Sequence, residues 1–227
     1  MFNVDQVVSE KLPKMNQQSL MSKSVKTVLR YLLHEKALVD IENKYPHARG
    51  VDFAETILDH FDFGYCISDK DREKIPVSGR VVIIANHPIG TLDGAALIKM
   101  VSEVRSDFKV VANDVLMNVK PLRSILLPVN NMGGNTIKKN LEAIHDHLNN
   151  EGVVIIFPAG EVSRISPTGV RDGSWHKGFL RFAAATQSPI LPVYMDARNS
   201  ALFYAVSMVY KPLSTLFLIK EMFKQAH

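Results

Sequence analysis

Short apolar runs alternate with amphipathic helical periods along the last two thirds of the chain. Five runs rich in valine and isoleucine have the length of buried strands: Val81–Ala85, Lys109–Ala112, Ile125–Val129, Val153–Phe157 and Ile190–Tyr194. Between them, apolar residues recur at helical spacing over Leu92–Val101, Thr136–Leu148 and Lys177–Ala185. Because strands that alternate with helices form layered domains, the pattern predicts an α/β fold with a mainly parallel or mixed central sheet covered by helices.

The chain before residue 79 has a helical pattern. Apolar residues between Ser22 and Tyr45 fall on one helical face among basic residues, so this helix either packs on the domain or lies on a membrane surface. A second pattern runs over Val51–Phe63, and the charged stretch Asp69–Ser78 is typical of a linker. We expect an N-terminal helical region at 1–78 and an α/β domain at 79–227, joined in one continuous structural unit.

The composition is that of an ordinary globular domain, since 46% of the 227 residues are hydrophobic and 22% are charged. A net charge of +4 is compatible with several anionic partners and specific to none, and we expect no nucleic-acid partner. The single cysteine, Cys66, excludes an internal disulfide, and no metal site is expected because no Cys/His cluster has zinc spacing. We expect a buried or idle Cys66 thiol.

The apolar segments are too short for a membrane span. No run reaches about 18 apolar residues, and the first residues lack the pattern of a secretory signal. We therefore expect a chain that neither crosses a membrane nor is exported. The apolar and aromatic tail, Leu202–Phe223, predicts core helices, with docking on lipid as the alternative.

Polar segments follow three of the predicted strands, namely NHP at 86–88, NNMGG at 130–134 and FPAGE at 157–161. Ligands of open parallel sheets bind beyond the carboxyl ends of the strands, so we expect these segments to converge on one edge. A histidine there suits general-base catalysis, because its unperturbed pKa is about 6.5. Asp93 is placed to orient His87; alternatively, Asp93 only caps the next helix and His87 is an ordinary loop residue.

Three segments together resemble a known family. Their order and spacing resemble those of the lysophospholipid (glycerolipid) acyltransferases; the segments are NHPIGTLDG at 86–94, FPAGEVSR at 157–164 and LPVYMDARNS at 191–200. The resemblance extends from about Arg80 to Tyr210. It is greatest to the branch labelled haemolysin-like. It implies transfer of a fatty acyl group from acyl-CoA or acyl-carrier protein to the hydroxyl of a lysolipid. It further implies His87 as base, Asp93 as its partner, no bound cofactor, and peripheral binding at the cytoplasmic face of a membrane.

The motifs depart from the family pattern in three places. Five residues separate His87 from Asp93 where the family has four, and the acid and arginine of the third block stand two positions later, as Glu161 and Arg164. The segment 130–135 lacks the arginine common in the second block. In the family, these arginines are thought to bind the phosphate of the acceptor, and lysine does not replace a bidentate arginine there. The acceptor headgroup is therefore left open. Lysophosphatidic acid is the first candidate, and lyso-ornithine lipid or another aminolipid is the second.

The same motifs contain the residues predicted to bind substrate. They are Asn86, Gly90, Gly133, Gly134, Gly160, Glu161, Ser163 and Arg164. The glycine pair predicts either an anion-binding turn or a plain one, and Arg164 either a phosphate ligand or an exposed arginine. Trp175, the only tryptophan, indicates packing, a bilayer contact or a lid, whereas the sequence His145-Asp146-His147 predicts solvated surface.

Two other functions compete with acyl transfer. Water in place of the acceptor would make the same site a hydrolase, although the chain has no Gly-x-Ser-x-Gly motif. A non-catalytic lipid-binding protein is the other alternative. Nucleotide binding is disfavoured because neither Gly-x-x-x-x-Gly-Lys nor Gly-x-Gly-x-x-Gly is present.

Overall fold

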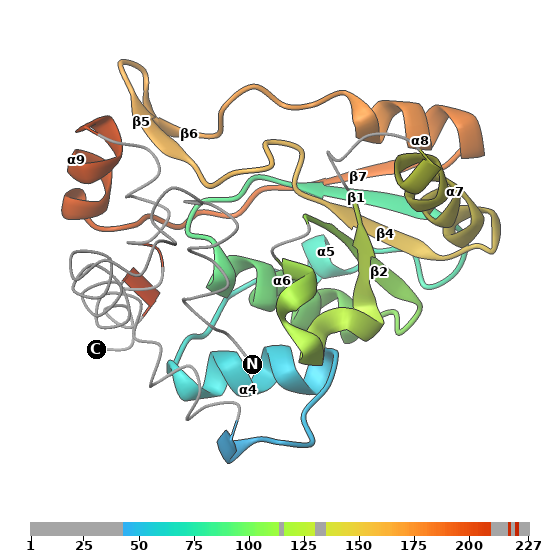
Figure 1. Ribbon diagram of the computed structural model, residues 1–227, viewed down its shortest axis with the longest axis horizontal. Coiled ribbons are helices and arrows are strands. Elements are labelled where there is room, and N and C mark those ends of the chain that lie inside the picture. The colour runs from blue at the N-terminus through green and yellow to red at the C-terminus, as the bar shows by residue number, and fades with distance from the viewer. Residues whose placement is uncertain (1–42, 114–115, 130–134, 210–217, 219–220, 223–227) are drawn as a thin grey trace, which may run out of the picture. The chain divides into compact units, whose positions relative to one another are not determined.

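The computed structural model in Figure 1 describes residues 43–113, 116–129, 135–209, 218 and 221–222. The chain divides into two compact units, one of Ala48–Asn199 and one of Met1–His47 with Ser200–His227. The helix predicted over Ser22–Tyr45 lies almost wholly outside the described residues. Among the described helices, none has both the length and the apolarity that a membrane crossing requires.

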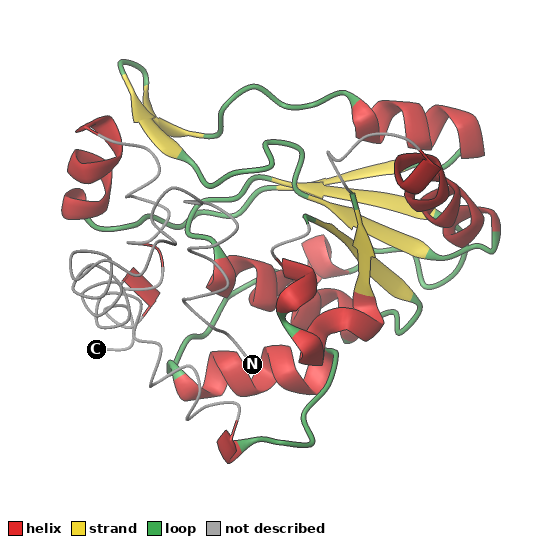
Figure 2. Ribbon diagram, viewed as in Figure 1, coloured by secondary structure: helices red, strands yellow, loops and turns green. Residues whose placement is uncertain are grey.

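A parallel sheet of five strands forms the centre of the unit Ala48–Asn199 (Figure 2). The strand order is β3-β2-β4-β1-β7, and Val82 in β1 aligns with Val154 in β4 and Ile190 in β7. The strands are β1 (Val81–Ala85), β2 (Phe108–Ala112), β3 (Leu126–Pro128), β4 (Val153–Ile156) and β7 (Ile190–Val193). The α/β prediction and its five strands are confirmed, with strand ends within one residue of those expected.

Helices cover both faces of the sheet, as Figure 1 shows. On one face, α7 (Asn135–Asn149) and α8 (Gly178–Thr186) pack against β1 and β4. The cluster there consists of Val82, Ile84, Ile144, Leu148, Val154, Ile156, Phe182 and Ala183. Alternate residues of a strand face opposite ways, and Ile83 and Ile155 are fully buried too. Burial on both faces explains why the central strands are unbroken apolar runs.

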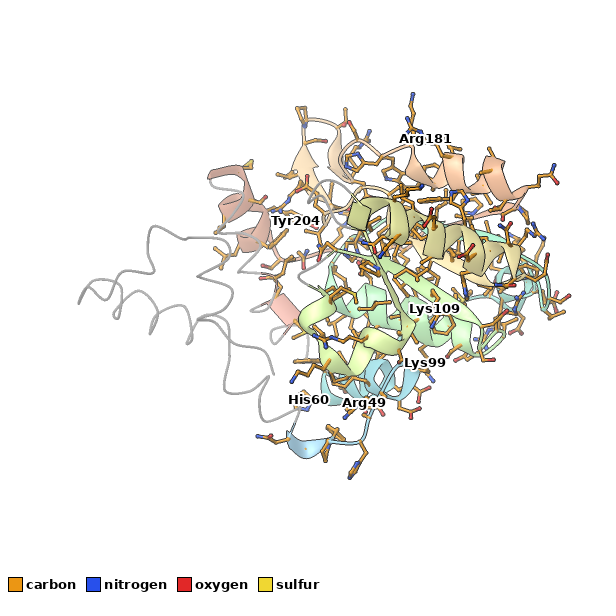
Figure 3. All side chains as sticks on the ribbon, turned by 45° about the vertical axis from the view of Figure 1, so that its right-hand side comes forward. Arg49, His60, Lys99, Lys109, Arg181 and Tyr204 are labelled. Atoms are coloured by element: carbon orange, nitrogen blue, oxygen red, sulfur yellow. The ribbon has the colours of Figure 1, made fainter. Side chains whose placement is uncertain are left out.

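The other helical layer contains α4 (Val51–His60) and α6 (Thr91–Ser102), which pack together. Lys99 of α6 lies 2.7 Å from Glu55 of α4, and Lys99 is labelled in Figure 3. The predicted linker contains a short helix, α5 (Asp69–Arg72), capped by the side chain of Ser68. Although α4 precedes residue 78, it belongs to the same compact unit as the sheet; the boundary at 78 stays a prediction.

Several short elements were missed by the sequence patterns. β5 (Arg164–Ser166) and β6 (Gly169–Arg171) form an antiparallel hairpin, and η2 (Leu116–Asn118) and η3 (Lys120–Ile125) are 3₁₀ helices. These elements lack the runs of valine and isoleucine that mark the strands of the sheet, and they contain too few positions for a period to be detected.

In the terminal unit, α9 (Ala201–Val209) agrees with the predicted helical tail as far as that tail is described. Buried Glu221 accepts hydrogen bonds from the backbone N–H and the hydroxyl of Ser200, each 2.7 Å long. These bonds satisfy polar groups directly before the start of α9.

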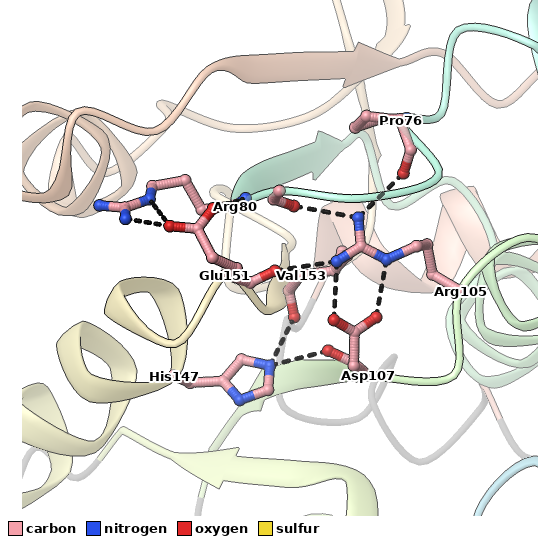
Figure 4. Close-up of polar contacts among 8 residues, drawn as sticks. Pro76, Arg80, Arg105, Asp107, His147, Glu151 and Val153 are labelled. Atoms are coloured by element: carbon pink, nitrogen blue, oxygen red, sulfur yellow. Dashed lines mark hydrogen bonds and ion pairs between the residues drawn. The ribbon is translucent and has the colours of Figure 1, made fainter.

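A hydrogen-bond network around Arg105 lies at the amino ends of the central strands (Figure 4). The guanidinium donates two hydrogen bonds of 2.7 Å to the Asp107 carboxylate. Three more bonds, of 2.9 to 3.0 Å, go to the carbonyls of Pro76, Gly79 and Glu151. The Arg105 hydrogen bonds hold the pKa of Asp107 below its usual value. The fork geometry of arginine thus joins the start of β2 to two neighbouring turns.

The same edge contains a second ion pair and a histidine. Arg80 binds Glu151 and lowers the pKa of that carboxyl through its hydrogen bonds. Nε2 of His147 lies 3.0 Å from the Asp107 carbonyl oxygen and 3.1 Å from that of Val153. The prediction of solvated surface is therefore wrong for His147, whose ring is held against the sheet. No described group of histidine, cysteine or acidic residues has the arrangement of a metal site.

Candidate active site

His87 and Asp93 form a pair at the carboxyl end of β1. Nδ1 of His87 lies 2.9 Å from Oδ1 of Asp93, an ion-pair contact, and neither atom makes a hydrogen bond among the described residues. The histidine side chain is 21% exposed, whereas the aspartate is only 3% exposed. A carboxylate at Nδ1 favours the tautomer with hydrogen on that nitrogen and leaves Nε2, across the ring, as the proton acceptor.

The second oxygen of Asp93 caps α6. Asp93 is the third residue of the helix, and its Oδ2 accepts hydrogen bonds from the backbone N–H groups of Ile89 and Gly90, 2.7 and 3.1 Å long. Gly90 has φ of 99°, a conformation that favours glycine. The sequence suggested two alternative roles for Asp93, helix cap and histidine partner. Both roles are present, because one carboxylate oxygen caps the helix and the other contacts the histidine.

Two of the three polar segments predicted to converge do meet. The His87 ring lies 4.4 Å, centroid to centroid, from the ring of Phe157, which directly follows β4. This contact is possible because β1 and β4 are neighbours in the sheet. The third segment, with Gly133 and Gly134, lies outside the described residues.

The side chain of Asn86 bonds to the chain that follows β7, and its role in substrate binding stays a prediction. Its Nδ2 donates to the carbonyl of Met195 at 2.8 Å, and its Oδ1 accepts from the Met195 N–H at 2.7 Å. Buried Asn199 donates to the Pro88 carbonyl at 3.2 Å. Hydrogen bonds from two amide side chains, those of Asn86 and Asn199, thus hold the loop on both sides of His87.

The backbone of His87 is fastened as well. Its N–H donates to Oδ1 of Asp172 at 3.2 Å, and its carbonyl accepts from the N–H of Ser163 at 2.8 Å. The Ser163 hydroxyl donates to the same Asp172 oxygen at 2.5 Å. Ser163 therefore contacts the histidine through its backbone, and its hydroxyl is directed to Asp172; its role in substrate binding stays a prediction.

The rest of the third block lies beside this contact. Gly160 has φ of 66° and faces the ring of His176, while Arg164, 14% exposed, lies 3.7 Å from Glu161 across a single turn. Arg164 is thus a sheltered arginine paired with a carboxylate, in contrast to the alternative of an exposed loop residue.

Two further expectations concerned single residues. Trp175 is 38% exposed and donates its indole N–H to Oδ2 of Asp172 at 3.0 Å. Cys66 is exposed, so the alternative of a buried thiol is wrong, and that of an idle thiol stays a prediction. Asp172, Asn199 and Phe157 were not identified as site residues. Of these, Phe157 had a signal in the sequence, since it opens a polar segment after a strand.

Comparison with known proteins identifies the family of the chain. The family model described as acyltransferase matches residues 6–226. A lyso-glycine lipid O-acyltransferase from Bacteroides thetaiotaomicron is 30% identical, and the alignment covers 100% of this chain and 84% of that protein. A second protein of the same name, from Phocaeicola vulgatus, is 28% identical over 89% of this chain and 74% of its own length. The matched range includes the His87–Asp93 pair and the residues that hold it, and the chain belongs to the acyltransferase family.

Proposed function

We propose that the protein is a lysolipid O-acyltransferase that uses a thioester donor, acyl-CoA or acyl-carrier protein, with His87 as its general base. The observation that carries the proposal is the 2.9 Å contact between Nδ1 of His87 and Asp93, in a pair whose histidine is reached by solvent and whose aspartate is not. A base fixed at one nitrogen and open at the other is what deprotonation of an alcohol requires.

The reaction then proceeds by direct transfer. Nε2 of His87 takes the proton of the acceptor hydroxyl while that oxygen attacks the thioester carbonyl carbon. The carbon–sulfur bond breaks, and the leaving thiolate takes the proton from the imidazolium, which gives an ester and a free thiol. Ser163 is not a nucleophile in this scheme, because its hydroxyl donates to Asp172 and not to His87.

The favoured acceptor is a lyso-aminolipid, and a lyso-glycine lipid in particular. Both relatives compared above have this substrate in their names. Arg164 is already accompanied by Glu161 at 3.7 Å, so its charge is partly balanced. A glycine headgroup carries at most one carboxylate, whereas a phosphate monoester carries up to two negative charges and favours arginines that bind it bidentately. Lysophosphatidic acid is the alternative acceptor.

An assay that offers labelled acyl-CoA and labelled acyl-carrier protein against several lysolipids tests donor and acceptor together. We expect lyso-glycine lipid to react with at least about tenfold higher kcat/KM than lysophosphatidic acid, a difference that polar headgroup contacts readily produce. Preference for lysophosphatidic acid would overturn the acceptor. Release of free fatty acid without ester formation would make the protein a hydrolase, and no turnover with either donor would overturn the function.

Contact with a membrane surface is part of the proposal, because a lysolipid is reached from a bilayer. Three exposed apolar side chains, Ile165, Trp175 and Leu180, lie on the stretch from β5 to α8. Because the proposed thioester donors are large and polar and do not cross bilayers, we propose the cytoplasmic face as the site of the reaction.

Sedimentation with lipid vesicles tests this contact. The double variant Ile165→Ser, Leu180→Ser should bind vesicles several-fold less than the unchanged protein. Val77→Ser is the matched control, since Val77 is exposed at the opposite end of the sheet. Equal loss in both variants would contradict a localised membrane contact.

A further inference from the structure

One carboxylate, that of Asp172, joins three groups around the proposed base. Its Oδ1 accepts from the N–H of His87 at 3.2 Å and from the Ser163 hydroxyl at 2.5 Å, and its Oδ2 accepts from the Trp175 indole at 3.0 Å. Asp172 follows β6, and in sequence it is 85 residues from His87. Nothing in the local sequence around His87 predicts this contact.

The bonds to His87 close a ring of hydrogen bonds. The histidine N–H is held by Asp172, the histidine carbonyl is held by the N–H of Ser163, and Ser163 is itself bonded to Asp172. The backbone groups on both sides of the His87 Cα are therefore fixed by the segment that follows β4. Ser163 is buried, which protects these bonds from competition by water.

Asp172 and Asp93 hold different parts of the same residue. Asp93 contacts the imidazole at Nδ1, whereas Asp172 contacts the main chain. Both oxygens of Asp172 accept hydrogen bonds from the chain, and the carboxylate faces a peptide N–H and not the ring. This arrangement suits a support and does not suit a second base.

We infer that Asp172 is a positioning residue that fixes the backbone of His87, and through it the place of Nε2. The inference rests on the proposed function, because positioning matters only if His87 takes a proton. A rotation of the His87 peptide would move Nε2 away from the acceptor hydroxyl, and a displacement of about 1 Å costs on the order of 100-fold in rate.

Four substitutions separate the three bonds. Asp172→Ala removes all of them, whereas Asp172→Asn keeps an oxygen for the His87 N–H and the Ser163 hydroxyl but loses the acceptor for the indole. Trp175→Phe removes the indole bond alone, and Ser163→Ala removes the hydroxyl bond alone. We expect Asp172→Ala to lower kcat by about 10- to 100-fold with KM changed by less than about threefold. Asp172→Asn should retain kcat within about threefold of the unchanged protein, and Trp175→Phe should lower kcat less than Asp172→Ala does.

A double-mutant comparison gives a measurement that a merely structural role would not affect. If Asp172 acts through His87, Asp172→Ala should not slow the residual transfer of a His87→Ala protein further. Residual rates are measured by long incubation with labelled acyl donor. An equal loss in both backgrounds would overturn the inference, as would an Asp172→Asn protein as slow as Asp172→Ala.

The design distinguishes failure of the inference from failure of the proposed function. If His87→Ala transfers acyl groups at the unchanged rate, the proposed base is wrong. If His87→Ala is inactive and Asp172→Ala keeps full activity, only the role of Asp172 is wrong. Circular dichroism and thermal melting confirm that each variant is folded, and Asp172→Asn provides the test should Asp172→Ala fail to fold.

Discussion

The two ends of the parallel sheet use charged side chains in opposite ways. At the amino end, Arg105 is almost fully buried and makes five hydrogen bonds, all to groups of the chain. At the carboxyl end, His87 is partly exposed and contacts Asp93 through one ring nitrogen. A group whose donors are all satisfied holds the fold together, whereas a group fixed on one side and open on the other is available for chemistry.

A surface depression does not by itself indicate which end of the sheet holds the active site. A shallow depression of about 370 Å³ lies at the amino end, beside Arg105, Asp107 and Glu151. The Arg105 guanidinium is already bonded to Asp107 and to three backbone carbonyls, so it is not available to bind a ligand there. We therefore assign the chemistry from the bonding of the side chains and not from the shape of the surface.

The largest expected effect concerns the carboxyl end. His87→Ala should lower kcat by about 100- to 10,000-fold, because it removes the general base, while the melting temperature changes little. The measurement is initial-rate transfer from labelled acyl donor to lyso-glycine lipid. A purified variant with the unchanged rate would contradict the assignment of the base.

Substitutions of Asp93 test whether its carboxylate both caps α6 and orients His87. In Asp93→Asn, an amide oxygen still accepts from Ile89 and Gly90, but the amide nitrogen cannot accept from Nδ1 of His87. We expect about a 100-fold lower kcat with the stability nearly kept. Asp93→Ala should lose a further ~1 kcal/mol of unfolding free energy, because the cap is also removed. If Asp93→Asn melts early yet turns over normally, Asp93 is only a cap.

Asp107 is the matched test at the amino end. Asp107→Ala removes the bidentate partner of buried Arg105, so it should lower the free energy of unfolding by about 1 to 3 kcal/mol. The kcat of the folded enzyme should stay within about twofold of the unchanged value, since the network lies at the other end of the strands. Urea unfolding and the transfer assay measure the two quantities. A large loss of kcat would show that the two ends are not independent.

The smallest expected effect is on the pH dependence of stability. Arg105 and Arg80 lower the pKa values of Asp107 and Glu151 in the folded protein. The unfolded chain therefore binds more protons in acid, and the free energy of unfolding should fall as the pH drops below about 4. In Asp107→Asn this fall, measured as the urea midpoint at about pH 6 and about pH 3.5, should be shallower. An identical fall in both proteins would contradict a role for Asp107.

The sequence determined the strands of the sheet and the location of the pair. A run of apolar residues is a local property, and such runs predicted all five strands of the sheet within one residue at each end. Since a parallel sheet presents its carboxyl ends at one edge, His87 after β1 and Phe157 after β4 were expected to lie together, and their rings are 4.4 Å apart. Asp93 was placed by its spacing from His87.

Only the tertiary structure decided how the histidine is held. Both ends of the Asn86 amide bond to Met195, which no sequence pattern predicted, and Asp172 was not identified although it contacts the backbone of His87. The reason is physical. A pattern of apolar residues specifies which segments are buried, but the partner of a polar side chain depends on the path of a distant loop. For Asp172 that path follows β4 and the hairpin, and short elements of this kind leave no periodic pattern in the sequence.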